Sequence, residues 1–164
     1  MRRILRTVTL ALLCGQGVAL AAGPCDTPAH RQFDFWVGEW TVHKVDGSIA
    51  GENTITREFG GCVLRERYAT PSGYRGESLN IYDASRKRWH QTWVDIGGAL
   101  LQLEGGFQDG RMVLEGEGVG ADGKPLRHRI SWTPLEDGRV RQHWESTDAS
   151  GQWTTAFDGT YSRK

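Results

Sequence analysis

Polar and aromatic side chains that could form a binding site recur at alternate positions along several stretches of this sequence. Ser78 and Asn80 belong to one such series, and Gln91 and Asp95 belong to another. Side chains two positions apart lie on the same face of a β-strand, so each series points in one direction. We expect a single interior to contain Glu66, Ser78, Asn80, Tyr82, Gln91, Trp93, Asp95, His128, Trp132, Gln142 and Trp144.

This set of residues combines aromatic walls with a few polar groups, which is the usual composition of a small-molecule pocket. Polar side chains are costly to bury unless they hydrogen-bond to one another, to water or to a ligand. The set therefore predicts a cavity for a small, partly apolar ligand. A filled interior with a self-satisfied polar network is the alternative that the sequence leaves open.

Three of these residues could transfer protons: Glu66, Asp95 and His128. They could serve a hydrolase or an isomerase, but nothing in their spacing fixes the distances between them. His128 could instead bind haem or a metal, or be a hydrogen-bonded interior residue. The sequence contains no nucleophile elbow, phosphate loop or HExxH motif. We therefore predict no metal site and no cofactor and favour a binding protein, with an enzyme or a haem-binding barrel as the alternatives.

Ten short segments must position these side chains. Asp-Gly and Gly-Gly turn signals separate runs of about six to ten residues rich in Val, Ile, Thr, Tyr and Trp. A short helical turn is expected over Pro28 to Phe35. Without a crossover helix the strands must pair antiparallel, and a sheet of this length is expected to close. The prediction is an all-β, up-and-down barrel of about ten strands: 39–45, 49–58, 62–69, 76–83, 88–95, 99–105, 111–118, 125–134, 139–147 and 152–161.

The turns also predict which residues face each other. A turn with a glycine bulge between Leu135 and Arg139 places Trp132 opposite Gln142. Leu79, Ile81 and Val94 then fall on the outer face and are the main exceptions to its polar character. Further expected pairs are Met112 with Trp132, Leu114 with Ile130, Ile130 with Trp144, Gln91 with Leu103, Asn80 with Gln91, and, in the last hairpin, Ser146 with Trp153, Trp144 with Thr155 and Gln142 with Phe157.

The first 21 residues have the pattern of a secretory signal peptide. Three arginines precede an apolar run that ends on Ala19-Leu20-Ala21, a small-x-small cleavage pattern. The run is too short and too interrupted for a membrane span. We expect a single barrel domain over residues 22–164, exported to the periplasm or the extracellular space. In that oxidising setting Cys25 and Cys62 would form a disulfide, and two free buried thiols are the alternative.

Charge excludes one class of partner. The chain has 20 basic and 20 acidic residues, and removal of Arg2, Arg3 and Arg6 with the leader leaves 17 against 20, a net charge of −3. A nucleic-acid-binding protein would carry a strongly basic face. We therefore expect a small-molecule ligand, no nucleic acid, and a monomer or a weak dimer.

Several motifs resemble a bacterial family of small proteins of unknown function, and the resemblance covers nearly all of the chain after the leader. The motifs are FDFWVGEWTV from Phe33, GGCVLRERY from Gly60, GESLNIYD from Gly76, RWHQTWVD from Arg88, LEGGFQDGRMVLEG from Leu103, RISWTPLEDGRVRQHWE from Arg129 and FDGTYSRK at the end. The family looks calycin-like, similar in architecture to lipocalins, fatty-acid-binding proteins and nitrobindin. The resemblance implies a barrel but no activity.

The segment FDFWVGEW, Phe33 to Trp40, could form the mouth of the site or the plug of the barrel. In lipocalins a glycine-x-tryptophan pair lies beneath the barrel, and Gly38-Glu39-Trp40 resembles it. We therefore expect Trp40 to close the narrow end and Phe33, Phe35 and Trp36 to dock a turn there. Nitrobindin-like barrels hold haem through a histidine near the C-terminus, and the expected last strand contains none, which argues against haem.

Overall fold

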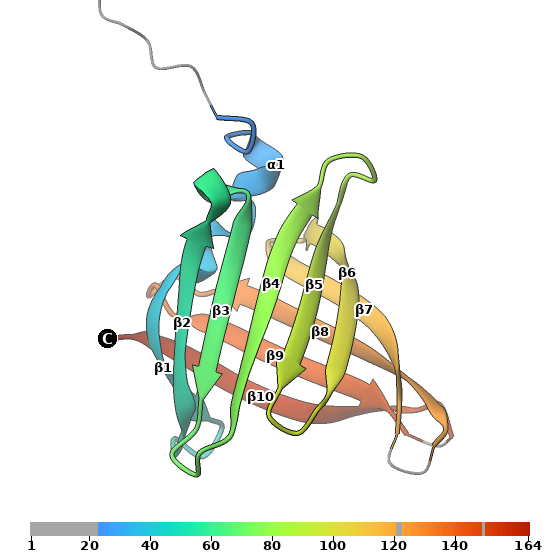
Figure 1. The fold of residues 1–164 in the computed structure, drawn as a ribbon. Coiled ribbons are helices and arrows are strands. Elements are labelled where there is room, and N and C mark those ends of the chain that lie inside the picture. Colours follow the sequence, from blue (N-terminus) through green and yellow to red (C-terminus); the bar gives the residue numbers. More distant parts are fainter. Residues whose placement is uncertain (1–22, 121–122, 149) are drawn as a thin grey trace, which may run out of the picture.

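The computed structural model describes residues 23–120, 123–148 and 150–164, and in them ten antiparallel strands close into one barrel (Figure 1). Each strand pairs with its neighbours in sequence, and the first pairs with the last. The predicted all-β, up-and-down fold is confirmed. The strands are β1 (Gly38–Lys44), β2 (Ile49–Glu58), β3 (Val63–Ala69), β4 (Arg75–Asp83), β5 (Arg88–Asp95), β6 (Leu100–Gln108), β7 (Arg111–Val119), β8 (Pro125–Pro134), β9 (Val140–Thr147) and β10 (Trp153–Arg163). The predicted leader lies outside the described residues.

Local turn chemistry sets most of the register. The backbone N–H of Gly138 donates to the carbonyl of Leu135 at 3.0 Å, and Leu135 pairs with Arg139 through a 2.8 Å bond. Gly138 adopts a φ of 81° in this turn. The turn places Trp132 opposite Gln142, as predicted. The predicted pairs of Met112 with Trp132, Leu114 with Ile130, Ile130 with Trp144, Gln91 with Leu103 and Asn80 with Gln91 are also confirmed.

The register predicted for the last hairpin is wrong. Thr147, not Ser146, pairs with Trp153, and a bulge between Thr155 and Phe157 then places Phe157 opposite Trp144. The bulge moves β10 from one face to the other. Trp153 therefore lies on the outer face, where the guanidinium groups of Arg127 and Arg129 stand 5.0 and 4.5 Å from its ring centre. Phe157 points into the barrel and pairs with a different residue of β9 than expected.

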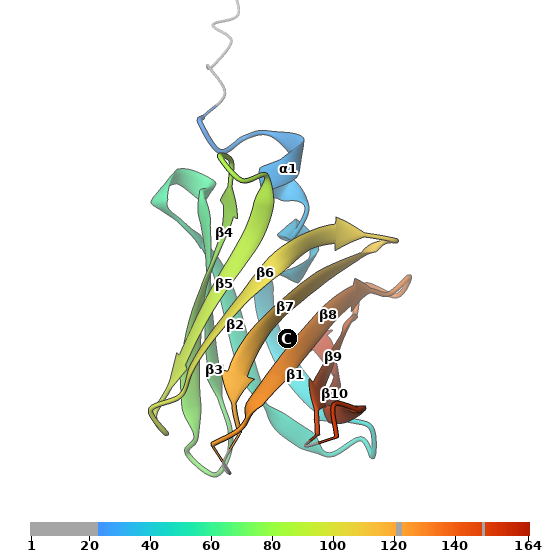
Figure 2. The same cartoon turned by 90° about the vertical axis from the view of Figure 1, so that its right-hand side faces the viewer.

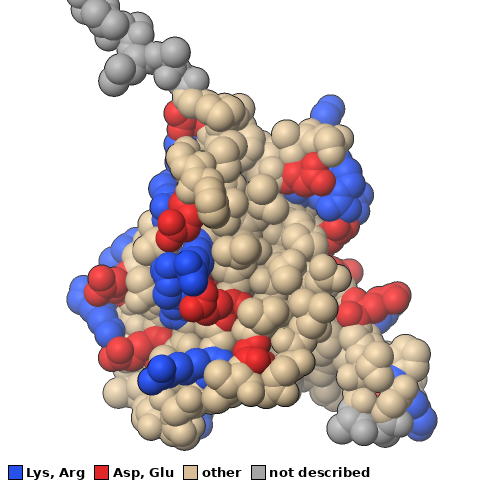
Figure 3. Space-filling model, in the orientation of Figure 1, with Lys and Arg blue, Asp and Glu red and all other residues tan. Residues whose placement is uncertain are grey.

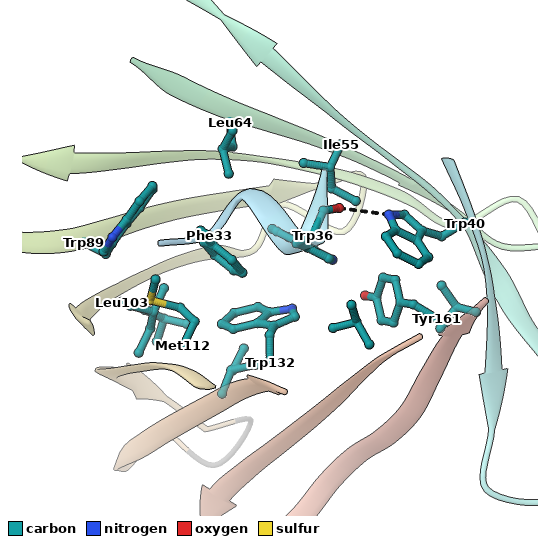
Figure 4. Packing of buried hydrophobic residues seen from close by; sticks show 14 of the residues in the cluster. Phe33, Trp36, Trp40, Ile55, Leu64, Trp89, Leu103, Met112, Trp132 and Tyr161 are labelled. Atoms are coloured by element: carbon teal, nitrogen blue, oxygen red, sulfur yellow. Dashed lines mark hydrogen bonds between the residues drawn. The ribbon is translucent and has the colours of Figure 1, made fainter. Parts of the chain in front are cut away.

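A short N-terminal segment closes one end of the barrel. It contains α1 (Pro28–Arg31) and the 3₁₀ turn η1 (Asp34–Trp36), which extends one residue beyond the predicted helical region (Figure 2). Phe33 and Trp36 are fully buried and stack with ring centres 4.8 Å apart. Both rings also pack against Trp132 (Figure 4). We call Phe33, Phe35 and Trp36 the plug, because they fill this end of the lumen.

Two links hold the plug in place. Trp40 is fully buried, and its indole N–H donates to the carbonyl of Trp36 at 2.9 Å (Figure 4). A disulfide joins Cys25, ahead of α1, to Cys62 at the start of β3, with 5.0 Å between the Cα atoms. The predicted disulfide is thus confirmed. The FDFWVGEW segment lies at the plug end of the barrel and does not form its mouth.

The outer face of the barrel is mainly charged and paired. On the side of β2 and β3, arginines lie beside acids in Figure 3, and Arg65 pairs with Glu77 at 2.6 Å. Leu79, Ile81 and Val94 are exposed on β4 and β5, as expected. No helix in the described part of the chain is both long and apolar enough to cross a membrane.

Candidate binding cavity

A cavity of about 420 Å³ occupies the half of the barrel away from the plug. It lies between the end of β3, the start of β4, the β5–β6 turn and the start of β10, and it opens at their loops. The plug seals the other end, so the cavity has its mouth at this end. Its lining is Glu66, Tyr68, Tyr74, Gln91, Trp93, Asp95, Ala99, Leu100, Leu101, Gly118, Val119, His128, Ile130, Trp132, Gln142, Trp144, Ala156, Phe157 and Tyr161.

Aromatic side chains form the walls of the cavity. The Trp93 ring lies directly over Gly76 on the neighbouring strand, so close that a Cβ atom at residue 76 would come within 2.1 Å of it. Tyr68 and Tyr74 meet edge to face at 6.5 Å. The absence of a side chain at Gly76 therefore sets the position of one wall.

Replacing Gly76 with alanine should displace the Trp93 ring and lower the free energy of unfolding by about 1 to 3 kcal/mol, the usual cost of overpacking. Gly106→Ala is the matched control, because a Cβ atom there would meet nothing within 4 Å. We expect that control to stay within about 0.5 kcal/mol of the wild type. Chemical denaturation measures both. If the two variants were equally stable, Trp93 would not be fixed over Gly76.

Glu66 is the buried acid of the lining. One carboxylate oxygen accepts a hydrogen bond from Asn53 Nδ2 at 2.7 Å, and the other accepts one from the Ser78 hydroxyl at 2.6 Å. Burial raises the pKa of Glu66 from 4.5 to about 7, against the opposing effect of these two hydrogen bonds. At neutral pH the group therefore exchanges between its charged and neutral forms.

Two hydrogen-bonded chains extend from Glu66. On one side Asn53 Nδ2 also reaches the Tyr161 hydroxyl at 3.3 Å, and that hydroxyl donates to Gln142 Oε1 at 2.5 Å. On the other side Asn80 donates to Ser78 at 2.9 Å, and Gln91 donates to Asn80 at 2.8 Å. The interior polar groups predicted from sequence thus largely bond to one another.

Some buried polar atoms have no partner among the described residues. They include Asn53 Oδ1, beside Glu66, and the indole nitrogen of Trp132, which lines the cavity. Buried donors and acceptors are usually satisfied, by protein or by a bound molecule. Both atoms have almost no exposed surface, so they lie in the packing behind the cavity and not on its open surface.

Asp95 shapes the mouth. One carboxylate oxygen accepts hydrogen bonds from the Tyr74 hydroxyl at 2.7 Å and the Trp93 indole at 3.3 Å. The other accepts from the backbone N–H groups of Gly97 and Ala99. The bond from Tyr74, with smaller contributions from the others, lowers the pKa of Asp95, so the group stays ionised. Asp95 ties the β3–β4 loop to the β5–β6 turn.

His128 belongs to β8, which lies on the opposite side of the barrel from β3, the strand that carries Glu66. Its Nδ1 accepts a hydrogen bond from the Trp144 indole at 3.1 Å, which places the proton of the neutral ring on Nε2. Desolvation lowers the pKa of His128. Nε2 lies against Gly118, where a Cβ atom would come within 2.7 Å of it. Because Nδ1 accepts the bond from Trp144, Nε2 carries the proton of the neutral ring and in this form offers no lone pair to a haem iron.

Eight of the predicted site residues line the cavity: Glu66, Gln91, Trp93, Asp95, His128, Trp132, Gln142 and Trp144. Ser78 and Asn80 lie behind the lining and support it. Tyr82 lies apart, at the plug end, where its ring meets His30 at 5.1 Å and Trp89 at 6.1 Å. Glu66, Asp95 and His128 bond to separate partners, which gives no geometric support to a shared acid/base site among the described residues.

The sequence matches no protein family model and no curated protein. The function must therefore be inferred from the cavity. The described residues contain no cluster of three or more His, Cys, Asp or Glu side chains that could hold a metal ion. Sequence reasoning missed Asn53, although its alternation with Ile55 on β2 indicates that it points inward. It also missed Tyr74, which precedes β4 and follows no strand pattern.

Proposed function

We propose that this protein is exported and binds a small, partly apolar molecule inside the barrel. The observation that carries the proposal is the cavity of about 420 Å³, open at one end and sealed by the plug at the other. Small-molecule pockets have volumes of roughly 300 to 1,000 Å³ and combine apolar walls with a few polar groups. This cavity has both properties, because Glu66, Gln91 and Gln142 lie among its apolar and aromatic walls.

Two further features support the proposal. The disulfide between Cys25 and Cys62 is typical of proteins that fold in an oxidising compartment, and the first 21 residues have the signal-peptide pattern. The closed up-and-down barrel is the architecture that the calycin-like resemblance implies, and calycin-like barrels place ligands in the lumen.

Native mass spectrometry of the oxidised protein, after incubation with lipid and metabolite extracts, tests this function. We expect one bound small molecule per barrel. Ala99 and Ala156 are exposed residues of the lining at the mouth, so Ala99→Trp and Ala156→Trp should block entry without disturbing the core. Ala84→Trp is the matched control, because Ala84 is exposed in the β4–β5 turn at the plug end.

The blocked variants should lose at least about 90% of the bound molecule, and the Ala84→Trp control should retain it. A protein that stays empty in every extract would contradict the proposal. Equal binding by the blocked variants and the control would place the ligand outside the cavity and would contradict it as well.

A further inference from the structure

The described lining of the cavity carries two acidic side chains and no lysine or arginine, and its one histidine, His128, has a lowered pKa that favours the neutral form. Glu66 and Asp95 are its acids, and neither lysine nor arginine occurs among its described residues. Arginines of the barrel instead pair with acids on the outer face, as Arg129 does with Glu145 at 2.9 Å. A ligand with a carboxylate or a phosphate would meet like charge in the cavity and no cation to balance it. The charge distribution thus disfavours an anionic ligand.

The walls of the same cavity suit a positive charge. The face of an aromatic ring attracts a cation, and the attraction is stronger where water is excluded. This protein already uses the contact outside the barrel, where Arg127 and Arg129 lie over Trp153. Inside, seven aromatic side chains surround the cavity: Tyr68, Tyr74, Trp93, Trp132, Trp144, Phe157 and Tyr161.

The polar part of the lining has spare hydrogen-bond acceptors. Each oxygen of Glu66 accepts one hydrogen bond, whereas a carboxylate offers about four acceptor sites in all. An ammonium group would supply donors for the remaining acceptor sites of Glu66 and the opposite charge.

We propose that the ligand is a small organic cation with an apolar body, its ammonium group held by Glu66 and by the aromatic walls. This inference rests on the proposed function, and it names the chemical class of the molecule that the cavity takes. A carboxylate buried without a cation is costly in its charged form, and a bound ammonium group offsets part of that cost. Binding then favours the ionised form of Glu66, so the cation displaces a proton.

Proton displacement can be assigned to Glu66. The pKa of Glu66 is raised by burial to about 7. The pKa values of Tyr68, Tyr74 and Tyr161 are raised mainly by burial, that of Asp95 is lowered mainly by the hydrogen bond from Tyr74, and that of His128 is lowered by desolvation. Near pH 6.5 to 7 the tyrosines therefore keep their protons, Asp95 stays ionised and His128 is more often neutral than charged.

Three probes with one skeleton and different charges test the inference by isothermal titration calorimetry at pH 7: 4-phenylbutylamine, 4-phenylbutanol and 4-phenylbutyrate. We expect the amine to bind at least about tenfold more tightly than the alcohol, and the carboxylate to bind most weakly. Glu66→Gln should reduce the preference for the amine to less than about threefold. Glu115→Gln, which alters an exposed acid on the outer face of β7, should keep the full preference.

A second measurement uses the unmodified protein and does not depend on the folding of a variant. Titrations at pH 6.5 in buffers of different ionisation enthalpy count the protons exchanged on binding. The amine should release about one proton per barrel or somewhat less, because a group with a pKa near 7 is mostly protonated at that pH. The alcohol should release none.

Equal binding of the three probes, or tightest binding of the carboxylate, would overturn the cation inference while leaving a ligand-binding barrel in place. Amine binding without proton release would overturn the role of Glu66. Failure of all three probes would also overturn the cation inference, and the extract experiment then decides separately whether the barrel binds any small molecule.

Discussion

Replacing Trp40 with alanine will lower the free energy of unfolding by about 3 to 5 kcal/mol, the range for removing a buried tryptophan. Its side chain is fully buried, packs edge to face with Tyr161 at 6.2 Å and donates its indole N–H to the backbone of the plug. The substitution leaves a cavity, and it leaves the backbone carbonyl of Trp36 without its hydrogen-bond donor. Chemical denaturation of the oxidised protein, followed by circular dichroism, gives the measurement.

Trp153→Ala is the matched control for this prediction. Trp153 is held between Arg127 and Arg129 on the outer face, and a contact of that kind is worth about 1 kcal/mol or less. The same substitution should therefore have a much smaller effect there. If Trp40→Ala kept its stability but lost the ligand, Trp40 would belong to the site and not to the seal of the barrel.

The second large effect is a loss of stability between pH 4.5 and pH 8. In the unfolded chain Glu66 has the ordinary pKa of 4.5, and in the barrel the pKa is about 7 because the carboxyl is buried. Between these values the folded protein holds a proton that the unfolded chain has released. The stabilisation that the folded protein gains from this bound proton is therefore complete below pH 4.5 and is lost as the pH rises through 7. At about 1.4 kcal/mol per pKa unit, the loss is roughly 3 kcal/mol.

Glu66→Gln isolates this effect, because the amide keeps the shape of the carboxyl and does not titrate. The difference in unfolding free energy between wild type and this variant should fall by roughly 3 kcal/mol from pH 4.5 to pH 8. His128, whose lowered pKa gives a slope of opposite sign below pH 6.5, is present in both proteins and cancels. A difference that stays flat across this range would show that Glu66 titrates in the barrel as it does in water.

Local chemistry explains why the strands were predictable. Asp-Gly turns impose their geometry within a few residues, and alternating side chains then assign the faces. The turn at Ser150-Gly151 is the exception, because Thr147 and not Ser146 pairs with Trp153. The bulge at Ala156 was not predictable in this way, because no turn residue marks it. It moves β10 from an outward Trp153 to an inward Phe157, and its position follows from packing across the barrel.

The position of the site along the barrel was harder to predict than its face. Alternation indicates that Tyr82 and Trp93 both point inward, but not that one lies beside the plug and the other beside the mouth. Whether the lumen is open or filled depends on how far Phe33 and Trp36 enter it. That depth depends on contacts with Trp132, on a distant strand, and a local pattern contains no information about them.

The seal made by the plug makes the barrel a cup rather than a tube. A molecule in the cavity must leave by the opening through which it entered, so nothing can pass from one end to the other. The rate of exchange is then set at the rim, where Asp95 fastens the loop that carries Tyr74 to the turn at Gly97 and Ala99. Under the proposed function, the rim loops are the place to change the residence time of a ligand without changing the walls.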